Sequence, residues 1–202
     1  MSKTTRESVL TGIYIVAGIA GALVGWFLVS LVLRFRPAVP PLLAMGFFAG
    51  LALATARLHG SWWATMLLLL YMPASLVVQM FMISARTGRL PRVPPAQLLD
   101  WTISALPIAL AIMVSVQLLK GVARPKVGKC LLTGLFLAAG HTVQMSMFLT
   151  RFHIPLQADF LVNQALIGAG VGLGIGLGME LVDLVWSGRG ARMGFESPDA
   201  QR

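Results

Sequence analysis

Residues 160–186 have the sequence FLVNQALIGAGVGLGIGLGMELVDLVW, in which glycine occupies every second position of the middle part. In a helix in water, each glycine costs about 1 kcal/mol relative to alanine. In a bilayer the backbone must be hydrogen-bonded within its own segment, so an apolar run of this length forms a helix despite its glycines. The stretch therefore predicts a membrane-spanning helix that its neighbours approach closely.

The glycines are predicted to fall on two ridges of this helix, because residues four apart lie above one another. The two ridges are Gly168, Gly172 and Gly176, continued by Gln164 and Glu180, and on roughly the opposite side Gly170, Gly174 and Gly178. A helix that is smooth on two sides is suited to a place between two other helices. We therefore interpret the six glycines as packing positions, and this helix as a candidate central or moving element.

The composition of the whole chain is that of a membrane protein. Its 202 residues are 57% hydrophobic and only 11% charged, whereas soluble domains carry about 25% charged residues. The net charge is +9, but no basic run is long enough for a nucleic-acid surface, and no nucleic-acid partner is expected. The single cysteine, Cys130, excludes an intrachain disulfide and any cysteine-pair redox or zinc motif.

Six apolar segments approach or exceed the roughly 20 residues needed to cross a bilayer. They cover residues 9–33, 41–56, 62–84, 101–119, 130–150 and 160–186. We therefore predict an all-α, polytopic transmembrane helical bundle in a single domain, residues 1–186. The polar residues 187–202 are predicted to form a disordered cytoplasmic tail. The first segment is too long for a signal-peptide core and is expected to remain as an uncleaved span.

Basic residues are distributed unequally between the two sides of this predicted bundle. Ten of the sixteen lysines and arginines fall on the side that holds both termini. The positive-inside rule therefore predicts cytoplasmic N- and C-termini, in a cell membrane for which the bacterial inner membrane is the favoured compartment. Four tryptophans at span ends are expected to act as interfacial anchors: Trp62, Trp63, Trp101 and Trp186.

Two predicted helical hairpins resemble each other. Residues 78–82 (VQMFM) match residues 143–147 (VQMSM) at four positions, and an arginine follows both at the same spacing. The hairpin of the third and fourth spans is thus consistent with a repeat of the hairpin of the fifth and sixth. Two alternatives stay open: an inverted repeat, in which Arg36-Pro37 matches Arg124-Pro125, and chance similarity between apolar segments.

Polar side chains inside the predicted spans point to a site in the outer half of the membrane, because such residues are costly there and often mark function. The candidate substrate-binding residues are Tyr71, Ser75, Gln79, His141, Gln144, Asn163 and Gln164. At comparable depth on neighbouring helices, they are expected to line a cavity that opens outward. The alternative is that they form interhelical hydrogen bonds that only hold the bundle together.

Two carboxylates, Glu180 and Asp183, follow the glycines at the inner end of the last span. They are candidates for a gate or proton site at the inner mouth. Alternatively, they are interfacial acids paired with a nearby base: Arg189, Lys126 or Lys129. Asp100 and Asp159 precede the fourth and sixth spans, where helix capping and the positive helix end explain them.

Soft metal ligands suggest one further hypothesis. Met80 and Met145 occupy matching positions in the two similar segments, and His141 lies one turn before Met145, a set that suits Cu(I). Methionine is also an ordinary filler of apolar gaps, which is the interpretation that we favour. No nucleophile–base pair, HExxH helix or phosphate-binding loop occurs, so no catalytic residue, metal or cofactor is predicted.

Three classes of function remain open. The favoured class is a small-solute transporter, channel or substrate-binding membrane subunit, because transporters often combine internal repeats with a polar site inside the membrane. The second is a non-catalytic structural or assembly subunit, with other membrane subunits or further copies of the chain as partners within the lipid bilayer. The third is a membrane enzyme acting on lipid or quinone through His141 or Glu180, which lie at different predicted depths.

Overall fold

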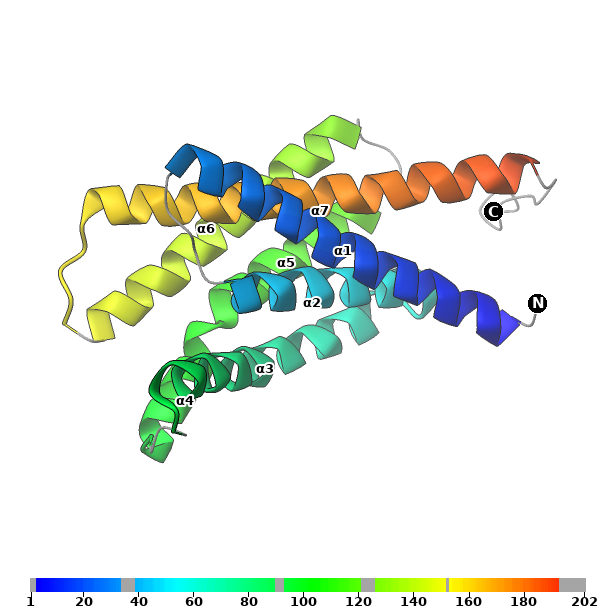
Figure 1. The fold of residues 1–202 in the computed structure, drawn as a ribbon. Helices are drawn as coiled ribbons and strands as arrows, with labels where there is room; N and C mark the ends of the chain where they lie inside the picture. The colour runs from blue at the N-terminus through cyan, green and yellow to red at the C-terminus, as the bar shows by residue number, and fades with distance from the viewer. Residues whose placement is uncertain (1–2, 34–38, 90–92, 121–125, 152, 193–202) are drawn as a thin grey trace.

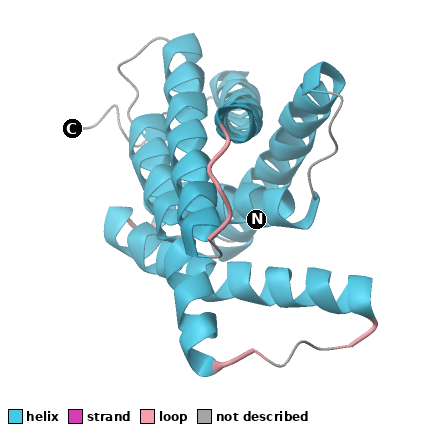
Figure 2. Cartoon of the chain, turned by 90° about the vertical axis from the view of Figure 1, so that its left-hand side faces the viewer, coloured by secondary structure: helices cyan, strands magenta, loops and turns pink. Residues whose placement is uncertain are grey.

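The computed structural model describes residues 3–33, 39–89, 93–120, 126–151 and 153–192, which form helices joined by short connections (Figures 1 and 2). The helices are α1 (Lys3–Leu33), α2 (Val39–Leu58), α3 (Ser61–Thr87), α4 (Pro95–Ser104), α5 (Leu106–Lys120), α6 (Lys126–Arg151) and α7 (Ala158–Arg192). Six helical stretches are long and apolar enough to cross a membrane, with α4 and α5 together forming one of them. The prediction of an all-α, six-span bundle is thus confirmed for the described residues.

The helices pack in an order that differs from their order in the chain. α7 lies between α6 and α1, α1 packs against α2, and α5 contacts both α2 and α6 (Figure 1). α3 packs against α2 and α5. The last and first spans are therefore neighbours, and α7 is enclosed by helices from opposite ends of the sequence.

One glycine ridge of α7 faces α6. A Cβ atom added at Gly168 would lie 2.5 Å from the carbonyl oxygen of Leu137, and one at Gly172 would lie 2.7 Å from that of Thr133. Gly176 meets the backbone of Cys130, at 3.0 Å from its Cα. The backbones of the two helices approach so closely that the hydrogen of glycine fits where a methyl group does not.

The second ridge faces α1. Gly174 packs against the carbonyl group of Gly21, and a Cβ atom at Gly178 would lie 2.5 Å from the carbonyl oxygen of Ala17. Gly21 and Gly25 of α1 in turn meet the backbone of α7, so both helices supply glycine to this contact. The alternation of glycine along α7 thus corresponds to two close helix contacts, on opposite sides.

The fourth span is interrupted at Ala105, between α4 and α5. Pro107 has no N–H to donate to the carbonyl group four residues earlier, which weakens the helix at this point. The helix also begins at Pro95, well before the expected start at Trp101, because proline fits the first turn of a helix. Asp100 therefore lies inside α4, and its predicted role as a cap is wrong.

The C-terminal end of α7 and the tryptophans at the span ends differ in part from the sequence predictions. Residues 187–192 of the expected disordered tail continue α7 as helix, and residues 193–202 lie outside the described part of the chain. Trp62 and Trp63 are exposed, as interfacial anchors should be, but Trp101 is buried against the protein and does not face the membrane interface. The side chain of Trp186 lies outside the described residues.

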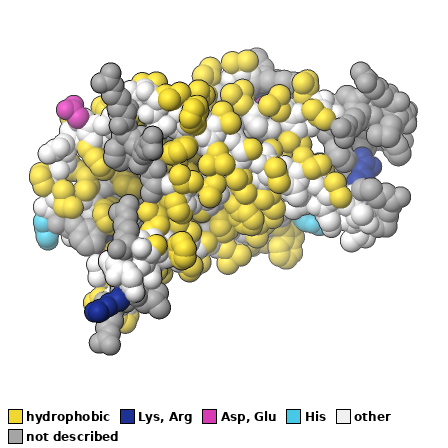
Figure 3. Space-filling model, viewed as in Figure 1, with side chains coloured by type: hydrophobic (Ala, Val, Ile, Leu, Met, Phe, Trp, Pro, Cys, Tyr) yellow, Lys and Arg dark blue, Asp and Glu magenta, His cyan; other side chains and the backbone are white. Residues whose placement is uncertain are grey.

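The outer surface is apolar over a broad middle band. Figure 3 shows hydrophobic side chains across the centre of the molecule, with Lys, Arg, Asp, Glu and His side chains towards the two ends. Exposed Phe27 of α1, Val77 of α3 and Leu135 of α6 belong to this surface. An apolar area of this extent is unfavourable in water but suits contact with lipid, which identifies the chain as a multi-pass membrane protein.

Candidate functional site

A hydrogen-bonded pair of buried polar residues lies between α6 and α7. Nε2 of His141 on α6 is 2.9 Å from Oε1 of Gln164 on α7, and only 6% and 7% of the two residues is exposed. An amide oxygen can only accept, so Nε2 donates and Nδ1 is the acceptor nitrogen of the ring. Nδ1 is buried and has no hydrogen-bond partner among the described residues.

The glycine ridge explains how these two side chains meet. Gln164 stands one turn before Gly168 on α7, and His141 stands one turn after Leu137 on α6. Because Gly168 packs directly on the backbone at Leu137, the two helices are close enough for the imidazole and the amide to bond. The structure thus brings together two of the residues that the sequence placed in one site.

The fourth span, which consists of α4 and α5 with a break at Ala105, packs beside the same part of α6. α6 runs beside α4 and α5, because Gly140 packs on Pro107 and the guanidinium group of Arg151 contacts Asp100. Gln144, which is buried, lies between these two contacts along α6. Trp101 lies between them along the broken span, and its Nε1 is the second buried side-chain nitrogen without a partner in the described residues.

The candidate residues on α3 have other surroundings. Tyr71 is buried, and its ring packs edge-on against Phe48 of α2, with centroids 5.5 Å apart. The hydroxyl of Ser75 donates to the carbonyl oxygen of Met72 in its own helix, at 2.9 Å. Asn163 is partly exposed beside Gln164. The side chain of Gln79 lies outside the described residues.

The residues of the copper hypothesis belong to two helices, Met80 to α3 and both His141 and Met145 to α6. α3 packs mainly against α2 and α5, whereas His141 bonds to α7. The described residues contain no group of three or more His, Cys, Asp or Glu side chains that would hold a metal ion. The geometry of the described residues therefore adds no support to this hypothesis, which stays a prediction.

A second polar cluster surrounds Asp183 of α7. Both carboxylate oxygens accept hydrogen bonds from Arg57 of α2, with Nη2 to Oδ2 at 2.6 Å. The hydroxyl of Tyr14 on α1 donates to Oδ1 at 2.5 Å and accepts from Arg57. Arg57 also donates to the carbonyl oxygen of Leu119 on α5, at 3.2 Å. Four helices are thus joined at this end of the bundle.

Glu180 forms a separate ion pair with α6. Its Oε1 is 3.9 Å from Nζ of Lys129, and the side chains are only 11% and 6% exposed. At this distance the two groups attract electrostatically but are beyond normal hydrogen-bond range. Of the bases proposed as partners from the sequence, Lys129 is therefore found beside Glu180, although in α6 and not in a loop.

The partner of Asp183 was not predicted. Arg57 follows the predicted second span, residues 41–56, directly; it lies in the last turn of α2 and points into the bundle. Arg57 is not among the bases proposed as partners from the sequence, which were Arg189, Lys126 and Lys129. The side chains of Arg189 and Lys126 lie outside the described residues. The sequence did contain a signal for this cluster, because Tyr14 and Arg57 lie at the same predicted depth in the membrane.

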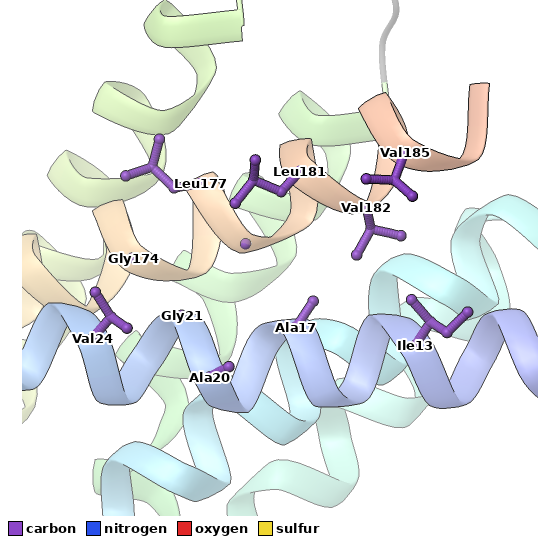
Figure 4. A pocket seen from close by; sticks show the side chains of 11 residues that line it. Ile13, Ala17, Ala20, Gly21, Val24, Gly174, Leu177, Leu181, Val182 and Val185 are labelled. Carbon is purple, nitrogen blue, oxygen red and sulfur yellow. The ribbon is translucent and has the colours of Figure 1, made fainter. Parts of the chain in front are cut away.

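An apolar groove runs along the outer side of the contact between α1 and α7 (Figure 4). Its volume is about 550 Å³. Figure 4 shows Ala17 and Ile13 of α1 opposite Leu181 and Val182 of α7. The groove contains the glycines of the close helix contact in its floor and carries no ionisable side chain in its lining.

Comparisons with known proteins add no functional information. The chain matches no protein-family model, no curated protein and no solved structure. The features of the chain that bear on function are therefore the polar region at His141 and the ion pairs at Glu180 and Asp183.

Proposed function

We propose that the chain is a small-solute transporter, channel or substrate-binding membrane subunit whose solute site lies beside His141, Gln144 and Gln164. The observation that carries the proposal is the buried imidazole of His141, with one nitrogen bonded to Gln164 and the other without a partner in the described residues. Buried polar groups nearly always find a hydrogen-bond partner. A ring nitrogen left over between apolar helices supports a site where a solute supplies the missing bond.

Ion pairs at both ends of α6 support gating of this site. Arg151 pairs with Asp100 at one end, and Lys129 pairs with Glu180 at the other. Gln164 and Glu180 are sixteen residues apart on α7, or about 24 Å along the helix. In the proposed transporter, the pairs of Glu180 and Asp183 close the inner mouth, and their separation opens it.

The glycine contacts of α7 supply a means for such a change. Both glycine ridges of the helix pack closely on the backbone of a neighbouring helix. Sliding of packed helices is one of the common forms of conformational change. We therefore assign α7 the role of the moving element, which carries Gln164 at the site together with Glu180 and Asp183 at the gate.

Cytoplasmic termini in a bacterial inner membrane complete the proposal, supported by the excess of basic residues on the side of the termini. The test is a pair of C-terminal fusions, one to green fluorescent protein and one to alkaline phosphatase. A fluorescent first fusion with an inactive second agrees with a cytoplasmic C-terminus. Phosphatase activity would place it outside.

Solute binding is tested by thermal unfolding of the purified protein in nanodiscs against a panel of small polar solutes. A solute at a hundred times its Kd stabilises the protein by about 2.7 kcal/mol. We expect the stabilisation to be lost in Gln144→Ala and kept in the control Ser146→Ala, whose hydroxyl bonds only to its own helix. Uptake into proteoliposomes should follow the same pattern. Equal stabilisation of both variants, or none of the wild type by any solute, would contradict the proposal.

The groove between α1 and α7 favours one alternative, an assembly subunit that receives a membrane helix of another protein there. Native mass spectrometry after mild extraction separates the two functions. A stoichiometric protein partner favours assembly, and a retained small molecule favours the solute site. The enzyme hypothesis has less support, because His141 contacts Gln164 whereas Glu180 contacts Lys129 in a separate cluster.

A further inference from the structure

Two adjoining apolar hollows lie along the contact between α1 and α7 (Figure 4). The first is the groove of about 550 Å³ described above, and the second has a volume of about 450 Å³. They share Ile13, Ala17 and Val182 and so form one continuous depression. Val9 and Val16, which line the second hollow, are 45% and 65% exposed on the outer surface. The depression therefore faces the lipid.

The depression begins near the bilayer centre and extends towards the two termini of the chain. Gly21 and Gly174 line it and are in close contact, and they lie near the midpoints of the first and last apolar segments. Arg6 on α1 and Arg189 on α7 each stand fifteen residues beyond this contact, or about 22 Å along a helix. This distance is half of the ~40–45 Å that a bilayer measures with its headgroups. Both arginine positions therefore lie at headgroup level.

On α1, a basic position shares the face that lines the depression. Arg6 stands three residues before Val9 and seven before Ile13, and both spacings keep residues on one face of a helix. Arg6 is exposed. Lys3 stands one turn before it, although the side chain of Lys3 lies outside the described residues.

α7 repeats this pattern in the opposite direction. Arg189 stands four residues after Val185 and seven after Val182, both of which line the groove, and Arg192 follows one turn later. The helix continues to Arg192, which fixes these positions on its backbone, while the side chains of both arginines lie outside the described residues. Basic positions therefore follow the depression on both of its walls.

The charge at this end of the two helices favours an anionic partner. Glu7 follows Arg6 by about 100° of helical rotation, away from the lining face, and Asp183 is bonded to Arg57. The lining of both hollows contains no ionisable side chain. A matching ligand is thus apolar over one leaflet and negatively charged at its headgroup. Basic residues at the membrane surface attract anionic lipids, and arginine binds phosphate through charge-assisted hydrogen bonds.

We propose that the depression between α1 and α7 is a binding site for one anionic diacyl phospholipid. Two adjoining hollows of similar volume hold its two acyl chains, and its phosphate lies among the basic residues at the headgroup end. The site is separate from the polar region at His141, so the proposal does not depend on the proposed function.

Photo-crosslinking locates the lipid without any variant. The full chain, depleted of lipid in nonionic detergent, receives dioleoylphosphatidylglycerol with a diazirine in one acyl chain, and mass mapping of peptides identifies the labelled residues. We expect labelling within residues 9–24 and 174–185, competed by unlabelled phosphatidylglycerol. Labelling spread evenly over the exposed apolar residues of α3 and α6 would overturn the proposal.

The headgroup is tested by native mass spectrometry of the same protein titrated with dioleoylphosphatidylglycerol or dioleoylphosphatidylcholine. Phosphatidylglycerol should bind at least tenfold more tightly. Arg6→Gln and Arg189→Gln should each weaken its binding about fivefold and leave phosphatidylcholine unchanged. Arg89→Gln, at an exposed arginine just past the end of α3, is the control. Equal affinity for the two lipids, or unchanged affinity in both variants, would refute the anionic specificity.

Ala20→Phe tests the hollow itself, because this exposed alanine lines the groove and a phenyl ring would fill it. Binding of both lipids should weaken about tenfold. Ala139→Phe is the matched control at an exposed alanine of α6, and unfolding midpoints in lipid-free detergent show that each variant is folded. Unchanged binding in folded Ala20→Phe would place the lipid elsewhere. A stoichiometric protein retained by the wild type and lost in Ala20→Phe would replace the lipid with a partner helix.

Discussion

Asp183 and Arg57 form an ion pair with two hydrogen bonds across 126 residues of sequence. The pair joins α7 to α2, and the hydroxyl of Tyr14 adds α1 through its bond to Asp183. About a quarter of each charged side chain is exposed. The carboxylate and the guanidinium are thus largely removed from solvent and depend on one another.

Arg57→Ala should destabilise the protein by about 2–3 kcal/mol, somewhat less than the 3–5 kcal/mol typical of a fully buried pair, because it leaves Asp183 charged without its partner. The double change Arg57→Ala with Asp183→Leu should be less destabilising, since no unpaired charge remains. Unfolding in detergent, followed by circular dichroism, measures both. Arg89→Ala is the control at an exposed arginine. A double variant as unstable as Arg57→Ala alone would show that the pair is not the cause.

Gly174→Ala tests the contact between α7 and α1. The added methyl group would overlap the carbonyl group of Gly21, so the helices must separate, which we expect to cost about 1–3 kcal/mol. Gly12→Ala on α1 is the matched control, because a Cβ atom there has open space. The same unfolding measurement compares them. Equal stability of the two variants would mean that α7 and α1 are not in close contact.

The sequence predicted the packing of the glycines better than the pairing of the charged residues. The alternation of glycine identified α7 as a helix with two close neighbours, because close backbone packing depends on residue size and helical period alone. It did not identify those neighbours as α6 and α1. Which helices meet depends on the packing of all spans together, a property that no single segment contains.

The candidate site, too, was predicted only in part. His141 and Gln164 were grouped correctly from their predicted depth, since topology fixes depth. Tyr71 was included for the same reason, yet it packs against Phe48 on α2, because depth does not fix the direction of a side chain around its helix. Arg57 was missed because its position at a predicted helix end looked like that of an ordinary loop base.

Gln164→Leu should lower stability by about 1–3 kcal/mol, because it leaves the buried donor Nε2 of His141 without its acceptor. The double change His141→Leu with Gln164→Leu removes both groups and should recover much of the loss. Thermal unfolding in nanodiscs compares the wild type, Gln164→Leu, His141→Leu and the double variant. Additive effects of the two changes would show that the side chains do not interact.

Cys130 provides a probe of the proposed inner gate, since it is the single cysteine of the chain, is buried, and lies beside Lys129 on α6. Opening of the Lys129–Glu180 pair should expose its thiol. Glu180→Gln removes this attraction; if the closed state loses about 1.4 kcal/mol, maleimide labelling of Cys130 under native conditions should become about tenfold faster.

Asp159→Asn, a change at an exposed acid at the other end of α7, is the control and should leave the labelling rate unchanged. Cys130→Ala in the Glu180→Gln background should abolish labelling, which assigns the signal to this thiol. Labelling must be compared at equal unfolding midpoints or corrected for the unfolded fraction, because global unfolding also exposes Cys130. An unchanged rate in folded Glu180→Gln would show that this pair does not hold the inner mouth closed, and would remove Glu180 from the gate.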